Sequence, residues 1–140
     1  MKRYKIAFVC TGNSCRSQMA EGWAKELGSD VFESYSAGTH PADAVNPFAI
    51  AVMKEAGVDI SSYQPKLLDE IPYEVDILIT MGCGVECPFL PANFREDWGL
   101  DDPAGNPIEA FRITRDTIKL KMLDLIGKVR EGAIVEINER

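Results

Sequence analysis

The sequence predicts an α/β fold in which a parallel β-sheet is flanked by helices, giving three layers. Apolar runs of strand length alternate along the chain with longer segments whose apolar residues recur at helical spacing. This alternation is typical of parallel sheets, because each connection between neighbouring parallel strands is usually a crossover helix. The 140 residues contain neither an internal repeat nor a linker-like stretch, so we expect one domain spanning residues 1–140.

The first half of the chain is expected to form two strands with a helix between them. Tyr4–Val9 is short, apolar and rich in aromatic residues, which indicates a buried strand. From Ser17 onward, apolar residues recur at helical spacing as far as Leu27, and Gly28 suits the end of a helix. Val31–Ser36 is the second expected strand.

The second half repeats the alternation with longer connections. Asn46 and Pro47 suit the cap and the first position of a helix, which Gly57 would end. Four further elements are expected: a short helix at 66–70, a strand at 75–81, a short strand near 98–100 and a long amphipathic helix at 107–129. The connection at 82–106 is rich in glycine, proline and cysteine, and a loop of this length is usually functional.

The composition excludes several classes of protein. The net charge of −7 at pH 7 argues against binding to nucleic acid or to anionic membrane surfaces. The apolar run at the N-terminus is too short for a signal peptide and no segment reaches transmembrane length, so we expect a cytoplasmic protein. There, the cysteines are expected to serve metal binding or thiol chemistry rather than structural disulfides. The four cysteines are Cys10, Cys15, Cys83 and Cys87.

The most informative segment, KIAFVCTGNSCRS, runs from Lys5 to Ser17. A strand ends at Cys10, a small polar loop follows, and Arg16 stands at the head of the expected helix. Such a loop can surround a tetrahedral oxyanion with backbone N–H groups, while the arginine binds two of its oxygens. The same field favours a thiolate at Cys10, which makes this residue a candidate nucleophile. We call residues 10–16 the anion loop. Its candidate ligand-binding residues, with the first helical serine, are Thr11, Gly12, Asn13, Ser14, Cys15, Arg16 and Ser17.

Cys83 and Cys87 form a second pair of thiols in the long connection. Cys83 follows a strand end, as Cys10 does, and the carboxyl ends of parallel strands meet at one edge of a sheet. We therefore expect these cysteines to lie close together. A segment with two thiols among glycines suits thiol–disulfide exchange. Two small buried hydrophobic residues, or a zinc site built from all four cysteines, are the alternative interpretations.

Further polar residues could complete such a site. Attack by a thiolate on an oxyanion needs a general acid that protonates the departing oxygen, and Asp101 or Asp102 could serve. An aspartate before Pro103 is equally typical of a turn. Asn13 suits a left-handed backbone, and Ser36 at the end of the neighbouring strand could hold its side chain. The alternative is that these are two unrelated polar groups in loops.

Four segments of the chain carry a resemblance to a known family. CTGNSCRSQMAEGW, SAGT, NPFAIAVMKEAGVDIS and DWGLDDPAG resemble the thioredoxin-coupled arsenate reductases, which have the low-molecular-weight protein tyrosine phosphatase fold. This resemblance implies a four-stranded parallel sheet. Phosphatases of the same fold share the first motif but lack a pair like Cys83 and Cys87, and typically carry tyrosine where this chain has Ala104. Hydrolysis of phosphotyrosine through a Cys10 phosphoenzyme is the alternative activity.

The resemblance implies the reduction of arsenate to arsenite, for arsenic detoxification. The Cys10 thiolate would attack arsenate in the anion loop, while Asp102 protonates the leaving oxygen. Cys83 would then attack the Cys10 sulfur, releasing arsenite and leaving a transient Cys10–Cys83 disulfide. Cys87 would convert it to a Cys83–Cys87 disulfide and free Cys10. Three residues would support the loop: Ser17 by hydrogen bonding to the thiolate, and Asn13 with Ser36 by holding the backbone.

The resemblance also sets expectations for partners and cofactors. A thioredoxin-like protein would reduce the final disulfide, although the short Cys-x3-Cys spacing leaves a glutaredoxin or glutathione route open. Phosphate or sulfate would mimic arsenate. We expect a monomer that needs no metal or other cofactor. Some members bind potassium through an acidic residue after the VDIS segment, but SSYQPKLL offers no such acid, so potassium is left as an alternative and not as a requirement.

Overall fold

A four-stranded, all-parallel sheet forms the centre of the molecule, which confirms the predicted fold class. The computed structural model describes residues 3–82 and 91–132. Its elements are β1 (Tyr4–Cys10), α1 (Arg16–Leu27), β2 (Phe32–Gly38), α2 (Pro47–Glu55), the 3₁₀ helix η1 (Leu68–Glu70), β3 (Val75–Thr80), β4 (Ala92–Asp97) and α3 (Ile108–Arg130). The strand order is β2-β1-β3-β4, so β1 lies inside the sheet.

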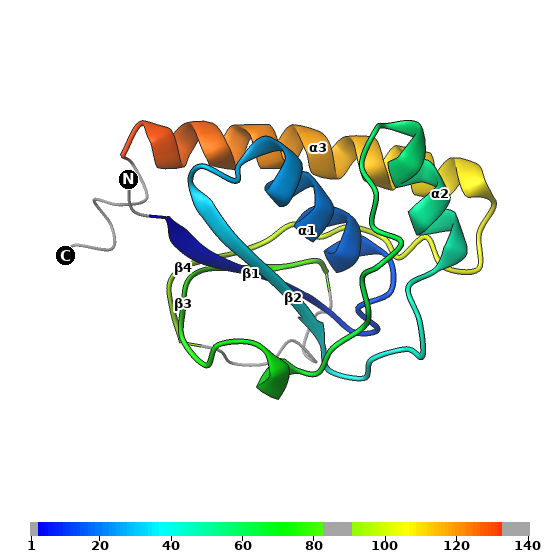
Figure 1. Cartoon of the computed structure of the whole chain (residues 1–140), viewed down its shortest axis with the longest axis horizontal. Coiled ribbons are helices and arrows are strands. Elements are labelled where there is room, and N and C mark those ends of the chain that lie inside the picture. Colours follow the sequence, from blue (N-terminus) through cyan, green and yellow to red (C-terminus); the bar gives the residue numbers. More distant parts are fainter. Residues whose placement is uncertain (1–2, 83–90, 133–140) are drawn as a thin grey trace.

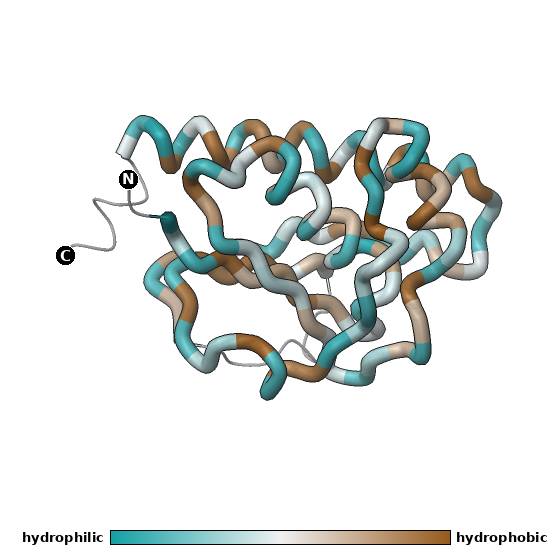
Figure 2. Tube along the Cα trace, in the orientation of Figure 1, coloured by the Kyte–Doolittle hydropathy of each residue, from teal (hydrophilic) through white to brown (hydrophobic). Residues whose placement is uncertain are grey.

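The two faces of the sheet are covered by different elements. Ile6 and Phe8 of β1 pack into a large core with apolar residues of all three α-helices, whereas Ala7 and Val9 belong to a smaller cluster on the opposite face, which η1 covers (Figure 1). Burial on both faces explains why β1 is apolar almost throughout. Along α3, hydrophobic and hydrophilic residues alternate, as expected of a helix with one buried face (Figure 2).

The fourth strand lies earlier in the chain than the sequence predicts. The expected strand near 98–100 is wrong, because β4 ends at Asp97. This strand is an edge of the described sheet and most of its residues are exposed, so its sequence ANFRED lacks an apolar run. Trp98, which directly follows it, is buried against Phe8 with 6.0 Å between ring centroids. The apolar signal at Trp98 therefore comes from the core and not from a strand.

The helix boundaries follow the local signals. The Asn46 side chain caps α2 by accepting the N–H of Phe48 at 2.8 Å. Just beyond the end of this helix, Gly57 has a φ of +84°, a left-handed conformation that glycine adopts without a side-chain clash. The helix predicted at 66–70 is confined to the three residues of η1.

The strand order distinguishes the carboxyl end of β1 from the ends of the other strands. The chain leaves β1 through α1 to form β2 on one side, and β3 pairs with β1 on the other side. Connections therefore diverge at the carboxyl end of β1, which is where open α/β sheets bind ligands. Cys10 is the last residue of this strand.

A charged cluster joins α2 to α3 at the surface. Glu55 accepts hydrogen bonds from Arg112 at 2.7 and 3.0 Å and from Arg115 at 3.0 Å. The hydrogen bond from Arg112, above all, lowers the pKa of Glu55 from 4.5 to about 2. A carboxylate with a lowered pKa stabilises the folded state above its unfolded pKa, and this contribution disappears as the pH falls through the folded value.

We expect Glu55→Gln to lower the melting temperature modestly at pH 7, since the cluster is exposed to solvent. The difference from the unmodified protein should shrink between pH 4.5 and about pH 2, because both proteins then carry a neutral side chain. Thermal unfolding followed by circular dichroism across this range measures it. Glu26→Gln, at an exposed position of α1, is the matched control. A difference that stays constant with pH would contradict the assigned ion pairs.

Candidate active site

The anion loop is shaped by hydrogen bonds that turn its carbonyl groups outward. The carbonyls of Thr11, Gly12 and Ser14 accept the N–H groups of His40, Ala42 and Asn46 respectively, each at 2.9 Å. Among the described residues, the N–H groups of Thr11, Gly12, Ser14 and Cys15 donate no backbone hydrogen bond. Because the carbonyls are occupied on the outside, a set of unpaired N–H groups is left to bind an anion.

The start of α1 adds to this field. Cys15 is its N-cap residue, yet no side chain caps the helix and no acidic residue stands in the first turn. The first N–H groups of a helix have no partner within it, and the helix dipole places partial positive charge at this end. The helix terminus and the loop thus both favour an anion at the same place.

Arg16 is fixed so that half of its guanidinium stays available. Its Nη1 donates to the carbonyls of Met81 and Leu100, both at 2.9 Å. Its Nε is buried and has no partner among the described residues, and Nη2 lies 3.8 Å from Asp102. A buried charged donor without a partner is unfavourable, so the Nε–Nη2 edge is suited to two oxygens of a bound oxyanion.

The Cys10 sulfur receives two polar contacts. The N–H of Asn13 donates to Sγ at 3.2 Å, and the Ser17 Oγ lies 3.0 Å from Sγ. Since Ser17 Oγ already accepts from Asn13 Nδ2 at 2.7 Å, its own proton is available to the sulfur. Hydrogen bonds donated to sulfur favour the charged thiolate, which is the nucleophilic form.

Cys15 is chemically different from Cys10 although both belong to the anion loop. Burial, above all, raises the pKa of Cys15 to about 11, and a weaker opposing effect comes from its contact with Ser14. A raised pKa favours the neutral thiol at physiological pH, which makes Cys15 a poorer nucleophile than a thiolate. Within residues 3–82 and 91–132, no group of three or more potential metal ligands occurs. Cys83 and Cys87, on which the zinc interpretation and the disulfide relay both depend, lie outside the described residues.

The structure distinguishes the two candidate acids. Asp102 lies beside Arg16 at the mouth of the loop, with a side chain that is 54% exposed. Its other oxygen accepts the N–H of Ala104 at 3.0 Å, so Asp102 also forms the turn that the sequence suggested. Asp101 makes no hydrogen bond or ion pair with a described residue and is exposed. The general-acid role of Asp102 stays a prediction.

Asn13 and Ser36 do not form the expected pair. Ser36 pairs in register with Phe8, and its hydroxyl donates to Glu21 of α1 at 2.5 Å. Asn13 instead has a left-handed backbone with a φ of 49°, and its Oδ1 accepts the N–H of Lys66 at 2.8 Å. The prediction of a left-handed asparagine is correct. The predicted pairing is wrong, because Ser36 binds Glu21 of α1 whereas the Asn13 side chain binds Ser17, Gln18 and Lys66.

Glu21 of α1 is a buried acidic residue outside the predicted set, and it faces Lys66, whose backbone N–H binds Asn13 of the loop. Glu21 is 5% exposed, and it faces the ammonium groups of Lys25 at 2.6 Å and of Lys66 at 3.8 Å. The signal that could have revealed it is spacing: Glu21 follows Ser17 by four positions, so both lie on one face of α1, where an acidic residue is unusual.

Comparison with known proteins agrees with this geometry. The profile of the low molecular weight phosphotyrosine protein phosphatase family matches residues 5–134. The chain belongs to this family. An arsenate reductase of Staphylococcus aureus (strain Newman) is 49% identical over 126 residues, which cover 86% of this chain and 94% of the relative.

Solved structures of arsenate reductases have the same fold as this chain. An arsenate reductase in the phosphate binding state has a TM-score of 0.81 and 41% identity, covering 89% of this chain and 98% of the other. The Corynebacterium glutamicum thioredoxin-dependent arsenate reductase has a TM-score of 0.76 and 28% identity, covering 93% of this chain and 63% of the other. In the part of the chain that the structure describes, no helix is long and apolar enough to cross a membrane.

We expect Arg16→Lys to weaken phosphate binding about 30-fold, because lysine keeps the charge but loses the planar fork and one charge-assisted hydrogen bond is worth about 2 kcal/mol. Calorimetric titration with inorganic phosphate measures this. Arg112→Lys, the same exchange at a surface cluster, should leave the affinity unchanged. Equal affinities of the two variants would exclude Arg16 as an oxyanion ligand.

Proposed function

We propose that this protein reduces arsenate to arsenite through a covalent Cys10–arsenic adduct and serves arsenic detoxification. The observation that carries the proposal is the buried Arg16 Nε, left without a partner beside an uncapped helix N-terminus and a thiol. Arsenate has the tetrahedral shape and negative charge that this arrangement favours. Relatives with 49% identity over most of the chain are arsenate reductases, which supports this substrate over a phosphate ester.

The first step is nucleophilic substitution at arsenic. The Cys10 thiolate donates its electron pair to arsenic, and one oxygen departs as water once it has been protonated. Asp102 is the acid in this proposal, since its carboxyl group stands at the mouth of the loop, near the Arg16 guanidinium. The loop N–H groups and Arg16 bind the remaining oxygens throughout, so that charge developing on oxygen is stabilised by fixed donors.

The second step moves two electrons onto arsenic. The Cys83 thiolate attacks the Cys10 sulfur, the sulfur–arsenic electron pair leaves with arsenite, and a Cys10–Cys83 disulfide forms. Cys87 then attacks Cys83, which releases Cys10 as a thiolate and leaves a Cys83–Cys87 disulfide. The proposal is supported by contacts at the start of this segment. Arg16 binds the carbonyl of Met81, two residues before Cys83 in the sequence.

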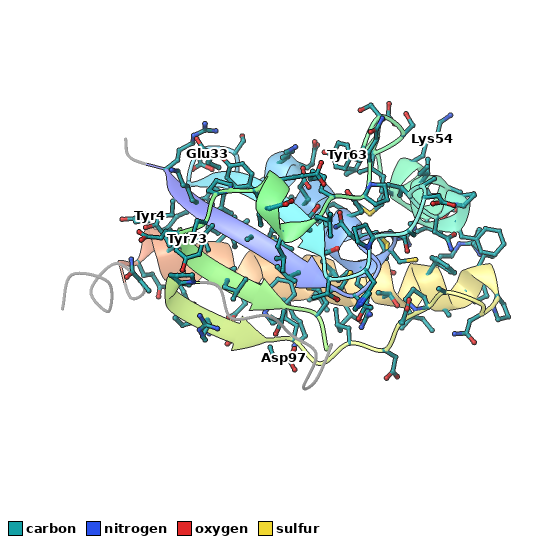
Figure 3. The ribbon with its side chains drawn as sticks, turned by 90° about the horizontal axis from the view of Figure 1, so that it is seen from below. Tyr4, Glu33, Lys54, Tyr63, Tyr73 and Asp97 are labelled. Carbon is teal, nitrogen blue, oxygen red and sulfur yellow. The ribbon has the colours of Figure 1, made fainter. Side chains whose placement is uncertain are left out.

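Asp97 of β4 holds the backbone at the end of β3, which leads to Cys83 in the sequence. It stands at the end of β4 (Figure 3), and its Oδ1 accepts the Thr80 hydroxyl and the Gly82 N–H, both at 2.8 Å. Gly82 has a φ of +101°, and a Cβ added there would lie 2.8 Å from the Leu100 carbonyl oxygen. The backbone that leads to Cys83 is thus held tightly beside the anion loop.

The reductant that we propose is a thioredoxin, because a structural relative is a thioredoxin-dependent arsenate reductase. A dithiol partner would reduce the Cys83–Cys87 disulfide by thiol–disulfide exchange and would itself be oxidised. This exchange requires a reducing compartment such as the cytoplasm. We further propose that the protein acts as a monomer, since the anion loop, Arg16 and Asp102 all come from one chain.

A single turnover tests the relay. Reduced protein given arsenate without any reductant should release one arsenite per chain and end with a Cys83–Cys87 disulfide, identified by peptide mass mapping. Cys87→Ser should still release one arsenite but stop at the Cys10–Cys83 disulfide, and it should lose turnover with thioredoxin. Undiminished multiple turnover by Cys87→Ser would show that the three-cysteine relay is wrong.

We also propose that the reaction needs no monovalent cation. The buried Glu21 carboxylate accepts the Ser36 hydroxyl, and the ammonium groups of Lys25 and Lys66 already supply positive charge to it. The kcat/KM for arsenate should therefore be equal in potassium, sodium and tetramethylammonium salts of the same ionic strength. A selective activation by potassium would contradict this proposal without affecting the relay.

A further inference from the structure

We propose that Gln18 is a positioning residue, which sets the direction of a hydrogen-bond chain that ends on the Cys10 sulfur. The inference rests on the proposed role of Cys10 as the nucleophile. Gln18 lies in the first turn of α1, and its side chain is completely buried, at 0% exposure. A buried amide needs hydrogen-bond partners, and those of Gln18 determine which way its amide group points.

Among the described residues, every partner of the Gln18 amide is an acceptor. Its Nε2 lies 3.0 Å from three oxygens, which are the carbonyl of Asn13, the Asn13 Oδ1 and the carbonyl of Gln64. Backbone carbonyls can only accept, so the NH₂ group of Gln18 must face them. Its Oε1 is buried and has no partner among the described residues. The orientation of the Gln18 amide is thus determined by its donors, and an unpaired acceptor is tolerated to achieve it.

The fixed Gln18 amide in turn fixes Asn13. The Asn13 Oδ1 accepts from Gln18 Nε2 and from the Lys66 N–H, so it cannot turn toward Ser17. The Nδ2 group therefore faces Ser17 and donates to its hydroxyl oxygen at 2.7 Å. With two donors on one side, the asparagine amide has a single favourable orientation.

The orientation of Asn13 decides where the Ser17 proton goes. A hydroxyl has one proton; because Asn13 donates to Ser17 Oγ, that proton can be given to Cys10 Sγ at 3.0 Å. If the asparagine amide were reversed, its oxygen would take this proton and the sulfur would lose a donor. The chain Gln18–Asn13–Ser17–Cys10 therefore delivers a hydrogen bond to the thiolate, and successive hydrogen bonds of one direction strengthen each other.

Two substitutions remove the NH₂ donor of Gln18 while keeping a side chain of similar size. Gln18→Met keeps a similar volume and removes the NH₂ group. Gln18→Glu keeps the shape but places acceptor oxygens against the two oxygens of Asn13, which favours the reversed asparagine amide. Arg16 and Asp102, the charged groups of the site, are untouched in both variants. Thr114→Val, which removes one buried hydroxyl from α3, is the control for a general loss of stability.

The experiment is the pH dependence of Cys10 alkylation by iodoacetamide, followed by peptide mass mapping. Cys15 reacts negligibly, because its pKa of about 11 keeps it protonated. We expect the rate at neutral pH to fall about tenfold in Gln18→Met, the loss of one hydrogen bond to a charged group, and further in Gln18→Glu. The alkylation profile should move to higher pH in both variants, and Thr114→Val should follow the unmodified protein.

A double-mutant cycle tests whether Gln18 acts through Ser17. In the Ser17→Ala background, Gln18→Met should have no further effect on the profile, because the chain is already broken. Additive effects, or a folded Gln18→Met variant with an unchanged profile, would overturn the inference. Should the Gln18 variants not fold, amide exchange in the unmodified protein decides: slow exchange of the Gln18 and Asn13 side-chain protons supports the chain, and rapid exchange contradicts it.

This experiment distinguishes the inference from the proposed function. Alkylation needs no arsenate, so slow alkylation of Cys10 in the unmodified protein would contradict its role as nucleophile and with it the proposed function. Rapid alkylation that Gln18→Met leaves unchanged would contradict only the role of Gln18.

Discussion

The left-handed backbone of Asn13 is the constraint on which the rest of the site depends. It directs the N–H of Asn13 to the Cys10 sulfur and its side chain to Ser17 and to the backbone of Lys66. The turn is possible because β2 ends beside it in Gly38, where a Cβ would lie 2.5 Å from the Thr11 carbonyl oxygen. The end of one strand, the start of a helix and a distant loop are thereby held around one sulfur atom.

Arg16 connects this thiol to the remaining chemistry. Its Nη1 donates to the carbonyls of Met81, two residues before Cys83, and of Leu100, two residues before Asp102. The Nε–Nη2 edge of the guanidinium stays available to an oxyanion. This local positive field explains how a chain with a net charge of −7 can bind an anion, since fixed donors at short range outweigh distant, solvent-screened charges. In the proposed mechanism, the same residue binds arsenate beside the backbone of Met81, two residues before Cys83 in the sequence.

Much of this arrangement could be predicted from the sequence, because the features involved are local. The apolar run of β1, the Asn46 cap and the loop between Cys10 and Arg16 each act within a few residues. The edge strand β4 was not predicted, because a mostly exposed strand has no apolar run. The strand was instead expected near Trp98, which is apolar because it packs against Phe8 in the core. The partners of Ser36 and Gln18 depend on which elements pack together, which spacing does not reveal; Cys83 and Cys87 stay predictions.

In the proposed function, the anion loop performs redox chemistry rather than hydrolysis. The most direct measurement compares, with one preparation of the protein, the kcat/KM for arsenate in the presence of thioredoxin and thioredoxin reductase with that for 4-nitrophenyl phosphate. We expect arsenite formation coupled to thioredoxin oxidation, at a kcat/KM well above that of phosphate ester hydrolysis. Rapid hydrolysis of the ester together with negligible arsenate turnover would contradict it.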